Sequence, residues 1–139
     1  MERLLEFATN HIALVSTFVA LLLALFFLDR KKAGATISPQ QTVLLMNKDA
    51  CVLVDIRDKK DYSTGHIKGS LHITLSAIKE RHTELKKFEG KTIVLVDKMG
   101  QHSGAAGKLF KDLGYSDVLR MQGGISEWQG QNLPLISKS

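Results

Sequence analysis

The chain has 139 residues, of which 44% are hydrophobic and 24% are charged, and its formal net charge is +5. This length accommodates one domain of ordinary size with an appendage, and the composition excludes a disordered chain. Basic residues are spread along the chain without an aromatic and basic platform, so the sequence does not indicate a nucleic-acid-binding protein. The single cysteine, Cys51, excludes an intramolecular disulfide.

The N-terminal part contains an uninterrupted apolar run. Residues 12–28, IALVSTFVALLLALFFL, include no charge, Gly or Pro, and only Ser16 and Thr17 are polar. As a helix they reach roughly 25 Å at about 1.5 Å per residue, near the lower limit for crossing a bilayer core. We therefore predict a transmembrane helix at 12–28, preceded by a short N-terminal segment, 1–11.

A cleaved signal peptide is the alternative interpretation of this run. Signal peptides carry a basic leading region, a shorter apolar run and a small-x-small cleavage site. Here two glutamates and one arginine precede the run, which ends in bulky LFFL followed by DRKK. These features favour a retained single-pass anchor. Because Arg30, Lys31 and Lys32 follow the run closely and only Arg3 precedes it, the C-terminal part is expected in the cytoplasm.

Strands and helices alternate after a predicted linker, 29–35. The segment SPQQTVLLMN starts with Ser38 as N-cap, Pro39 at the first helical position and Gln41 in a capping box, which predicts a helix. Apolar runs with β-branched residues predict buried strands at 50–56 and 91–97. DVLRM (117–121) is predicted as a further strand, and LHITL (71–75) is a candidate short strand. This alternation indicates a parallel α/β sheet with helices on both faces.

Two further segments are predicted as helices. The first is SAIKERHTELKKF (76–88), with a break expected near His82. Its apolar positions are Ile78, Leu85 and Phe88. The second begins with Ser103 as its cap and ends at Gly114. Its predicted buried face consists of Ala105, Ala106, Leu109, Phe110 and Leu113.

Two motifs flank the central part of the chain. LVDIRDKKDYSTGHIKGSLHI has an Asp at a strand end, an Arg two residues later, an aromatic residue and G-H-I-x-G-S. These residues are Asp55, Arg57, Tyr62, Gly65, His66, Ile67, Gly69 and Ser70. DLGYSDVLRMQGGISEWQGQNLPL contains L-G-Y, a strand, G-G-x-x-x-W (Gly123, Gly124, Trp128) and L-P. Together they resemble the rhodanese-like domain family over about Ile37 to Leu135.

The resemblance implies a rhodanese-like α/β fold, with a parallel five-stranded sheet flanked by helices, in residues 36–139. The motif residues also have structural roles. Asp55 and Arg57 are interpreted as an ion pair or loop-ordering set rather than acid–base catalysts. Gly65 and Gly69 permit tight or left-handed turns, His66 is expected to hydrogen-bond within its loop, and the tryptophan to cover the core. The histidines show no ligand spacing, so neither a metal nor another cofactor is predicted.

The segment VLVDKMGQHSGAAGKLF (94–110) reads as a strand, a polar loop and a helix start. The resemblance implies that in active members of the family this loop runs C-x-x-G-x-R-S. The backbone N–H groups of the loop and the helix N-terminus then stabilise the cysteine thiolate and the anionic persulfide that it forms. Aligned on Gly100 and Ser103, the loop here reads D-K-M-G-Q-H-S, so an Asp replaces Cys and a His replaces Arg. This degenerate loop comprises Asp97, Lys98, Met99, Gly100, Gln101, His102 and Ser103.

Neither replacement preserves persulfide chemistry. A carboxylate cannot hold a transferable sulfur, and losing the guanidinium removes a bidentate anion clamp. The remaining thiol, Cys51, starts a buried strand and is interpreted as a small core residue. Three interpretations of Asp97 stay open. In the first, its carboxylate occupies the anion-binding site formed by the N–H groups of the loop (the anion hole), with Lys98 as partner. In the second, the loop has lost that shape and Asp97 faces water, and in the third, Asp97 accepts a phosphoryl group. The last lacks a second carboxylate two residues on to hold Mg²⁺.

Two functions of different classes follow. We expect a membrane-anchored rhodanese-like protein that lacks the catalytic Cys and acts as a non-catalytic binding or regulatory module. The alternative is a rhodanese-type sulfurtransferase role through a partner's thiol or Cys51. The expected partners are the membrane and another protein, membrane proteins included, and not nucleic acid. The expected location is the cell membrane, which for bacterial members is the inner membrane, with the folded domain in the cytoplasm.

Overall fold

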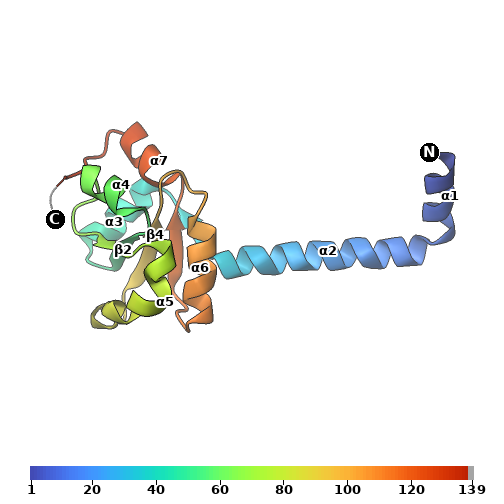
Figure 1. Cartoon of the computed structure of the whole chain (residues 1–139), viewed down its shortest axis with the longest axis horizontal. Coiled ribbons are helices and arrows are strands. Elements are labelled where there is room, and N and C mark those ends of the chain that lie inside the picture. The colour runs from blue at the N-terminus through green and yellow to red at the C-terminus, as the bar shows by residue number, and fades with distance from the viewer. Residues whose placement is uncertain (138–139) are drawn as a thin grey trace. The chain divides into compact units, whose positions relative to one another are not determined.

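The computed structural model describes residues 1–137, with the side chains of 29–33 left out of the description. The chain divides into two units, Met1–Lys31 and Lys32–Ser139 (Figure 1).

The first unit is helical. Helices α1 (Glu2–Asn10) and α2 (Ile12–Ala33) meet at His11, whose backbone leaves the helical region at φ −122° and ψ 38°. Among the described residues, no single helix is both long and apolar enough to cross a membrane. A bent pair of helices, Glu2–Asn10 and Ile12–Leu28, meets at 89°. Only together do the two helices have the length and apolar composition that crossing a membrane requires. The transmembrane helix at 12–28 therefore stays a prediction.

The second unit is built on a five-stranded parallel sheet in the order β1-β5-β4-β2-β3. The strands are β1 (Ala35–Ile37), β2 (Cys51–Asp55), β3 (Leu71–His72), β4 (Thr92–Val96) and β5 (Val118–Met121). Asp55 lies opposite Val96, so β2 and β4 end together at one edge of the sheet. The predicted sheet class is confirmed. The predicted linker instead lies in the end of α2 and the start of β1, except for Gly34.

Helices cover both faces of this sheet (Figure 1). One face carries η1 (Leu75–Ala77), α5 (Ile78–Arg81), η2 (His82–Phe88) and α6 (Ser103–Asp112), and the other carries α3 (Pro39–Asn47) and α7 (Gly124–Gly130). Successive residues of a strand point to opposite faces, so Val54 and Leu95 enter one core cluster while Leu53 and Val94 enter the other. Burial on both faces explains why the strands are continuously apolar. The capping box that starts α3 is present as predicted.

The predicted helix at 76–88 is not one α-helix. It is divided into η1, α5 and η2, and the break falls at His82, as expected. Ile78 and Leu85 are buried, and Phe88 packs partly buried against the same cluster. The apolar positions were therefore predicted correctly, whereas the helix type was wrong over η2.

The start and the face of α6 differ from the prediction. Ser103 is its first residue rather than its cap, and the preceding His102 makes no side-chain capping bond. The buried stripe contains Ala106 and Phe110 but not Ala105 or Leu113, which are exposed. Since a helix turns roughly 100° per residue, Ala105 faces away from a stripe centred on Ala106 and Phe110.

Candidate functional site

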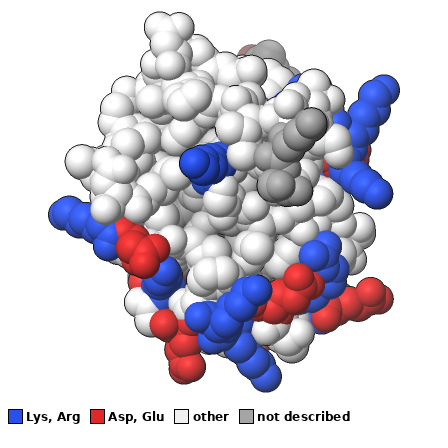
Figure 2. Space-filling model, turned by 90° about the vertical axis from the view of Figure 1, so that its left-hand side faces the viewer, with Lys and Arg blue, Asp and Glu red and all other residues white. Residues whose placement is uncertain are grey.

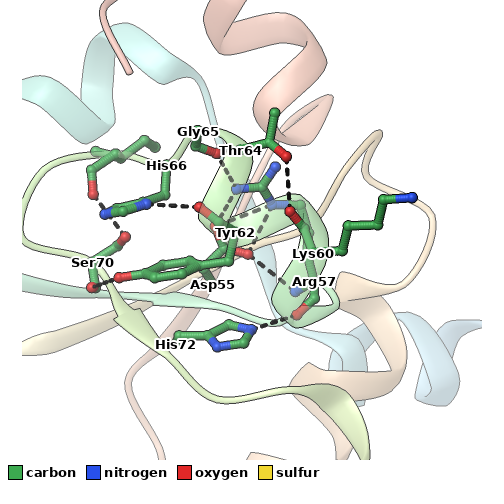
Figure 3. Close-up of polar contacts among 10 residues, drawn as sticks. Asp55, Arg57, Lys60, Tyr62, Thr64, Gly65, His66, Ser70 and His72 are labelled. Carbon is green, nitrogen blue, oxygen red and sulfur yellow. Dashed lines mark hydrogen bonds and ion pairs between the residues drawn. The ribbon is translucent and has the colours of Figure 1, made fainter. Parts of the chain in front are cut away.

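Asp55 and Arg57 form a buried ion pair after β2 (Figure 3). Arg57 Nε–H donates to Asp55 Oδ1 at 3.0 Å and Nη2–H donates to Oδ2 at 2.8 Å, while the Arg57 backbone N–H donates to Oδ1 at 3.0 Å. Arg57 Nη2 also donates to the Gly65 carbonyl oxygen at 2.7 Å. The guanidinium thus orders the loop, as interpreted from the sequence.

Tyr62 stabilises the loop that follows it. Its ring stacks between the imidazoles of His66 and His72, with centroid distances of 3.9 and 4.4 Å. The Tyr62 hydroxyl donates to the Ser70 carbonyl oxygen at 2.9 Å (Figure 3). His66 Nδ1 lies 2.8 Å from the Tyr62 carbonyl oxygen, and His72 Nε2 lies 2.7 Å from that of Arg57. Both imidazoles therefore donate to backbone carbonyls, as expected for His66.

Gly65 and Gly69 serve different purposes. Gly69 adopts φ +84° and makes the predicted left-handed turn, but Gly65 is extended, with φ 178°, so that prediction was wrong for Gly65. A Cβ on Gly65 would lie 3.3 Å from Leu135 Cδ1. The C-terminal segment pairs here with His66 through Ile136. Gly65 therefore permits a close approach rather than a turn.

Asp97 follows β4 and is 1% exposed. Its Oδ1 accepts the Gly100 N–H at 2.6 Å, and its Oδ2 accepts the N–H groups of His102 at 2.7 Å and Ser103 at 3.1 Å. Gly100 has φ +88°, which lets the loop curl around the carboxylate. This geometry matches the first interpretation, an internal anion in the anion hole, and contradicts the water-facing one. We define these three N–H groups as the cradle.

The cradle also explains how α6 starts. The Asp97 carboxylate accepts from the N-cap residue and the first residue of the helix, a role that Ser103 was expected to fill. A carboxylate here is favoured by the partial positive charge of a helix N-terminus. The predicted partner, Lys98, is exposed, and the described ion pairs do not join it to Asp97.

The start of α7 holds the loop from the other side. The Ile125 N–H donates to the Asp97 carbonyl oxygen at 2.8 Å, and the Ser126 N–H donates to that of Lys98 at 3.0 Å. Gly124 has φ +58°, and a Cβ on it would overlap the Asp97 carbonyl oxygen and lie 2.6 Å from Oδ1. Gly124 of the motif is therefore required for this close approach. Neither α7 nor its contact with the loop was predicted from the sequence.

Trp128 is a buried residue of α7 that packs in the core. It is 3% exposed, and its Nε1–H donates to the Pro134 carbonyl oxygen at 2.9 Å. Its ring belongs to the cluster of Leu53, Val94 and Ile67. The expected role of Trp128, covering the core, is therefore observed.

A cavity of about 390 Å³ lies between the two motif loops. It is lined by the acidic side chains of Asp58, Asp61 and Asp97 and by the basic side chains of Arg57 and Lys98. Ile56 and Leu75 supply apolar wall. The N–H groups of the cradle are already bonded to Asp97. The cradle therefore has no free N–H group to offer to an anionic sulfur donor. Within residues 1–137, no group of three His, Cys, Asp or Glu residues could hold a metal ion.

Cys51 lies away from this cavity. It is the first residue of β2 and pairs in register with Thr92 at the start of β4, so it lies at the opposite end of the strands from Asp97. Burial raises the pKa of the Cys51 thiol, an effect that the charge of Lys91 partly offsets. The half-buried side chain packs against the Trp128 cluster. A raised pKa disfavours the nucleophilic thiolate.

Comparison with known proteins identifies similar sequences and a similar solved structure. The chain is 30% identical over 140 residues to the uncharacterized protein YibN of Escherichia coli K12, covering 98% of both chains. It is 36% identical over 93 residues to the thiosulfate sulfurtransferase GlpE of Pseudoalteromonas translucida, covering 67% of this chain and 87% of GlpE. The fold resembles a rhodanese-related protein of Thermoplasma volcanium, with a TM-score of 0.66, 24% identity, and 75% and 99% of the chains covered. Residues 38–131 match the rhodanese-like domain, and the chain belongs to the rhodanese-like domain family.

Proposed function

We propose that this protein is a rhodanese-like module without sulfurtransferase activity, anchored in the membrane and used to bind or regulate another protein. The observation that carries the proposal is the position of the Asp97 carboxylate, which accepts all three N–H bonds of the cradle. A sulfurtransferase needs a thiolate nucleophile. Here an oxygen anion of the protein itself takes that place.

A sulfurtransferase role through Cys51 or a partner's thiol is the second candidate. The similarity to GlpE, a thiosulfate sulfurtransferase, favours it. The raised pKa of Cys51 and its place at the opposite end of β2 oppose it. We therefore rank the non-catalytic role first.

The anchor is supported by the first unit. Every side chain of residues 12–28 is exposed in this unit, and a long apolar surface of this kind requires cover. The two polar side chains of the run bond to their own helix: Ser16 Oγ donates to the Ile12 carbonyl oxygen at 2.6 Å and Thr17 Oγ1 to that of Ala13 at 2.8 Å. Such internal bonding suits a lipid surrounding, where water is absent. We propose a single span with the folded unit in the cytoplasm.

Activity is tested on the full chain in detergent micelles with thiosulfate and cyanide. The unmodified chain is expected to form no thiocyanate above the blank. The double variant Asp97→Cys with His102→Arg serves as positive control, because it restores the residue types of the active loop. Thiocyanate formation by the unmodified chain that disappears in Cys51→Ser would instead establish the second candidate function.

Topology is tested separately. A reporter fused after Ser139 should stay cytoplasmic, because three basic residues follow the apolar run closely. Protease accessibility of the reporter in spheroplasts, whose outer membrane is opened, would show export and exclude the cytoplasmic placement. Removing residues 1–31 should release a folded unit, since the second compact unit begins at Lys32.

A further inference from the structure

The two edges of the sheet differ in charge. Because all five strands are parallel, each strand starts toward one edge, which we call the amino edge, and ends toward the other. The segments that lead into β2, β3, β4 and β5 contain six lysines and four acidic residues, a net charge of +2. These segments are 48–50, 68–70, 86–91 and 111–117. The segments that follow the same strands contain four basic and four acidic residues; they are 56–64, 73–75, 97–102 and 122–127. The amino edge is therefore the more positive of the two.

Figure 2 shows where charged side chains gather on one side of the molecule. Lys and Arg side chains lie mostly along the lower edge, with Asp and Glu among them, whereas the broad middle carries only a basic side chain. Figure 1, which has the same vertical direction, shows α5 and the segment that leads from it into β4 at this end. The charged end of this side is therefore the amino edge of the sheet.

Four lysines of the amino edge lie around Phe88, the last residue of η2. The Nζ atoms of Lys87 and Lys91 lie 5.5 and 5.8 Å from the centre of the Phe88 ring. Phe88 and Lys91 line two cavities, of about 580 and 200 Å³. Lys86 lines the larger cavity and Lys68 the smaller one. We call these four lysines and Phe88 the lysine cluster.

Acidic residues on this surface balance the lysines only in part. Lys91 Nζ donates to Asp49 Oδ1 at 2.8 Å, which pairs one lysine with one carboxylate. Asp117, which accepts the Thr92 hydroxyl at 2.8 Å, and Glu89 line the larger cavity. These two carboxylates stand against the three exposed lysines of the cluster, which are Lys68, Lys86 and Lys87. The lysine cluster therefore keeps a positive charge.

The chain enters the sheet from the amino edge. Gly34 lies beside Val118, the first residue of β5, since a Cβ on Gly34 would lie 2.9 Å from the Val118 carbonyl oxygen. Ala35, which starts β1, is the seventh residue after the apolar run 12–28. Seven residues reach at most about 25 Å when fully extended. An anchor at 12–28 therefore holds the amino edge close to the bilayer, and the sequence DRKK directly after the run adds two net positive charges.

We propose that the amino edge, through the lysine cluster, binds the anionic phospholipid headgroups of the membrane that holds the anchor. The cytoplasmic surface of a membrane carries negative charge and attracts basic residues within about a Debye length. Lysine binds phosphate groups as a point charge. The covalent link to the span keeps this lipid surface within reach at high effective concentration, which selects it over a partner in solution. This inference rests on the anchor of the proposed function.

The contact also determines how the cradle is presented. Asp97 follows the last residue of β4, whereas the lysine cluster lies where β4 begins. Binding of the amino edge to headgroups leaves the cavity beside Asp97 at the edge away from the lipid surface. A protein partner of that cavity is then met from the cytoplasm.

The contact is tested with the full chain in vesicles of phosphatidylcholine, alone or mixed with phosphatidylglycerol. In a Cys51→Ser background, Ser116→Cys carries a fluorescent label at the amino edge, and Ser63→Cys carries it at the opposite edge. Both serines are exposed. A nitroxide on the lipid headgroups should quench the Ser116→Cys label at least about twofold more when phosphatidylglycerol is present, because the anionic lipid attracts the lysines. The Ser63→Cys label should not respond.

Matched charge variants identify the lysines that make the contact. Lys86→Gln with Lys87→Gln should remove the response to phosphatidylglycerol. Lys59→Gln with Lys60→Gln removes the same charge from an exposed pair at the opposite edge and should leave the response unchanged. The response should also disappear in about 1 M salt, where the Debye length falls to about 3 Å.

Three results would each overturn the proposal: equal quenching of the two labels, no response to phosphatidylglycerol, or equal losses in the two double variants. Absence of a response would leave an acidic protein as the occupant of the lysine cluster. Flotation with the vesicles at alkaline pH separates these results from failure of the anchor. An anchored chain floats with both lipid mixtures, whereas a released chain would overturn the anchor and the headgroup contact together.

Discussion

Asp55 and Asp97 end neighbouring strands and are both 1% exposed, yet their charges are compensated differently. Asp55 faces the guanidinium of Arg57 two residues on, whereas Asp97 is held only by backbone N–H groups. The first is an ion pair that orders a loop. The second is an anion in a site built from peptide dipoles, which another anion could occupy if the carboxylate were removed. Two equally buried carboxylates are therefore held in different ways, one by a side-chain cation and the other by backbone N–H groups.

The largest expected effect is at the ion pair. Asp55→Asn leaves the nearly buried Arg57 guanidinium without its counter-charge and should lower the free energy of unfolding by about 3 to 5 kcal/mol, measured by urea denaturation. Glu84→Gln is the control, because the Arg81–Glu84 pair is exposed and should leave the urea midpoint unchanged. Equal losses in the two variants would remove the distinction between buried and exposed pairs.

The contact between α7 and the loop gives the second effect. Gly124→Ala combines a left-handed backbone with overlap of the Asp97 carbonyl oxygen, so we expect a loss of about 2 to 4 kcal/mol. Gly130→Ala is the matched control, since a Cβ there meets nothing within 4 Å. Urea denaturation of both variants measures the difference. A stable Gly124→Ala variant would show that α7 does not clamp the loop.

The cradle itself gives a smaller loss. Asp97→Asn keeps the shape but loses the charge and one acceptor oxygen, so the free energy of unfolding should fall by about 1 to 3 kcal/mol. Asp112→Asn, an exposed change on α6, should have little effect. If both variants unfold at the same urea concentration as the unmodified chain, the three N–H bonds contribute nothing to stability.

The smallest effect concerns Cys51. Burial raises the pKa of the Cys51 thiol, so the folded state favours the neutral thiol. The resulting contribution to the free energy of unfolding is complete below the unfolded-state pKa of about 8.5. It is lost as the pH rises through the higher pKa of the folded state. The rate of alkylation by iodoacetamide should therefore rise at a higher pH than for a free thiol. A midpoint at or below that of free cysteine would restore Cys51 as a candidate nucleophile.

The sequence motifs predicted the fold class and the Asp55–Arg57 pair because their signals are local. An Asp and an Arg two residues apart at the end of a strand are close in any fold that forms the strand. Continuous apolar runs likewise identify strands buried on both faces. The replacement of the family's cysteine by Asp97 stays a prediction, which rests on aligning the loop on Gly100 and Ser103.

Other features depend on contacts between distant segments. The strand β1 has three residues and α4 (Lys59–Thr64) has six, too few for a hydrophobic period to show. The need for Gly65 comes from Leu135, and the need for Gly124 comes from Asp97, both far away in the chain. Capping of α6 by Asp97, six residues before Ser103, also lies outside local capping rules.

The most direct test of the cradle is the pKa of the thiol in an Asp97→Cys, Cys51→Ser variant, measured from the pH dependence of alkylation. If the N–H groups of Gly100, His102 and Ser103 are arranged for an anion, as their bonds to Asp97 show, the thiolate should be stabilised. Its pKa should then lie below the value of about 8.5 of a free thiol. A pKa at or above that value would contradict an anion-binding cradle and, with it, our account of Asp97.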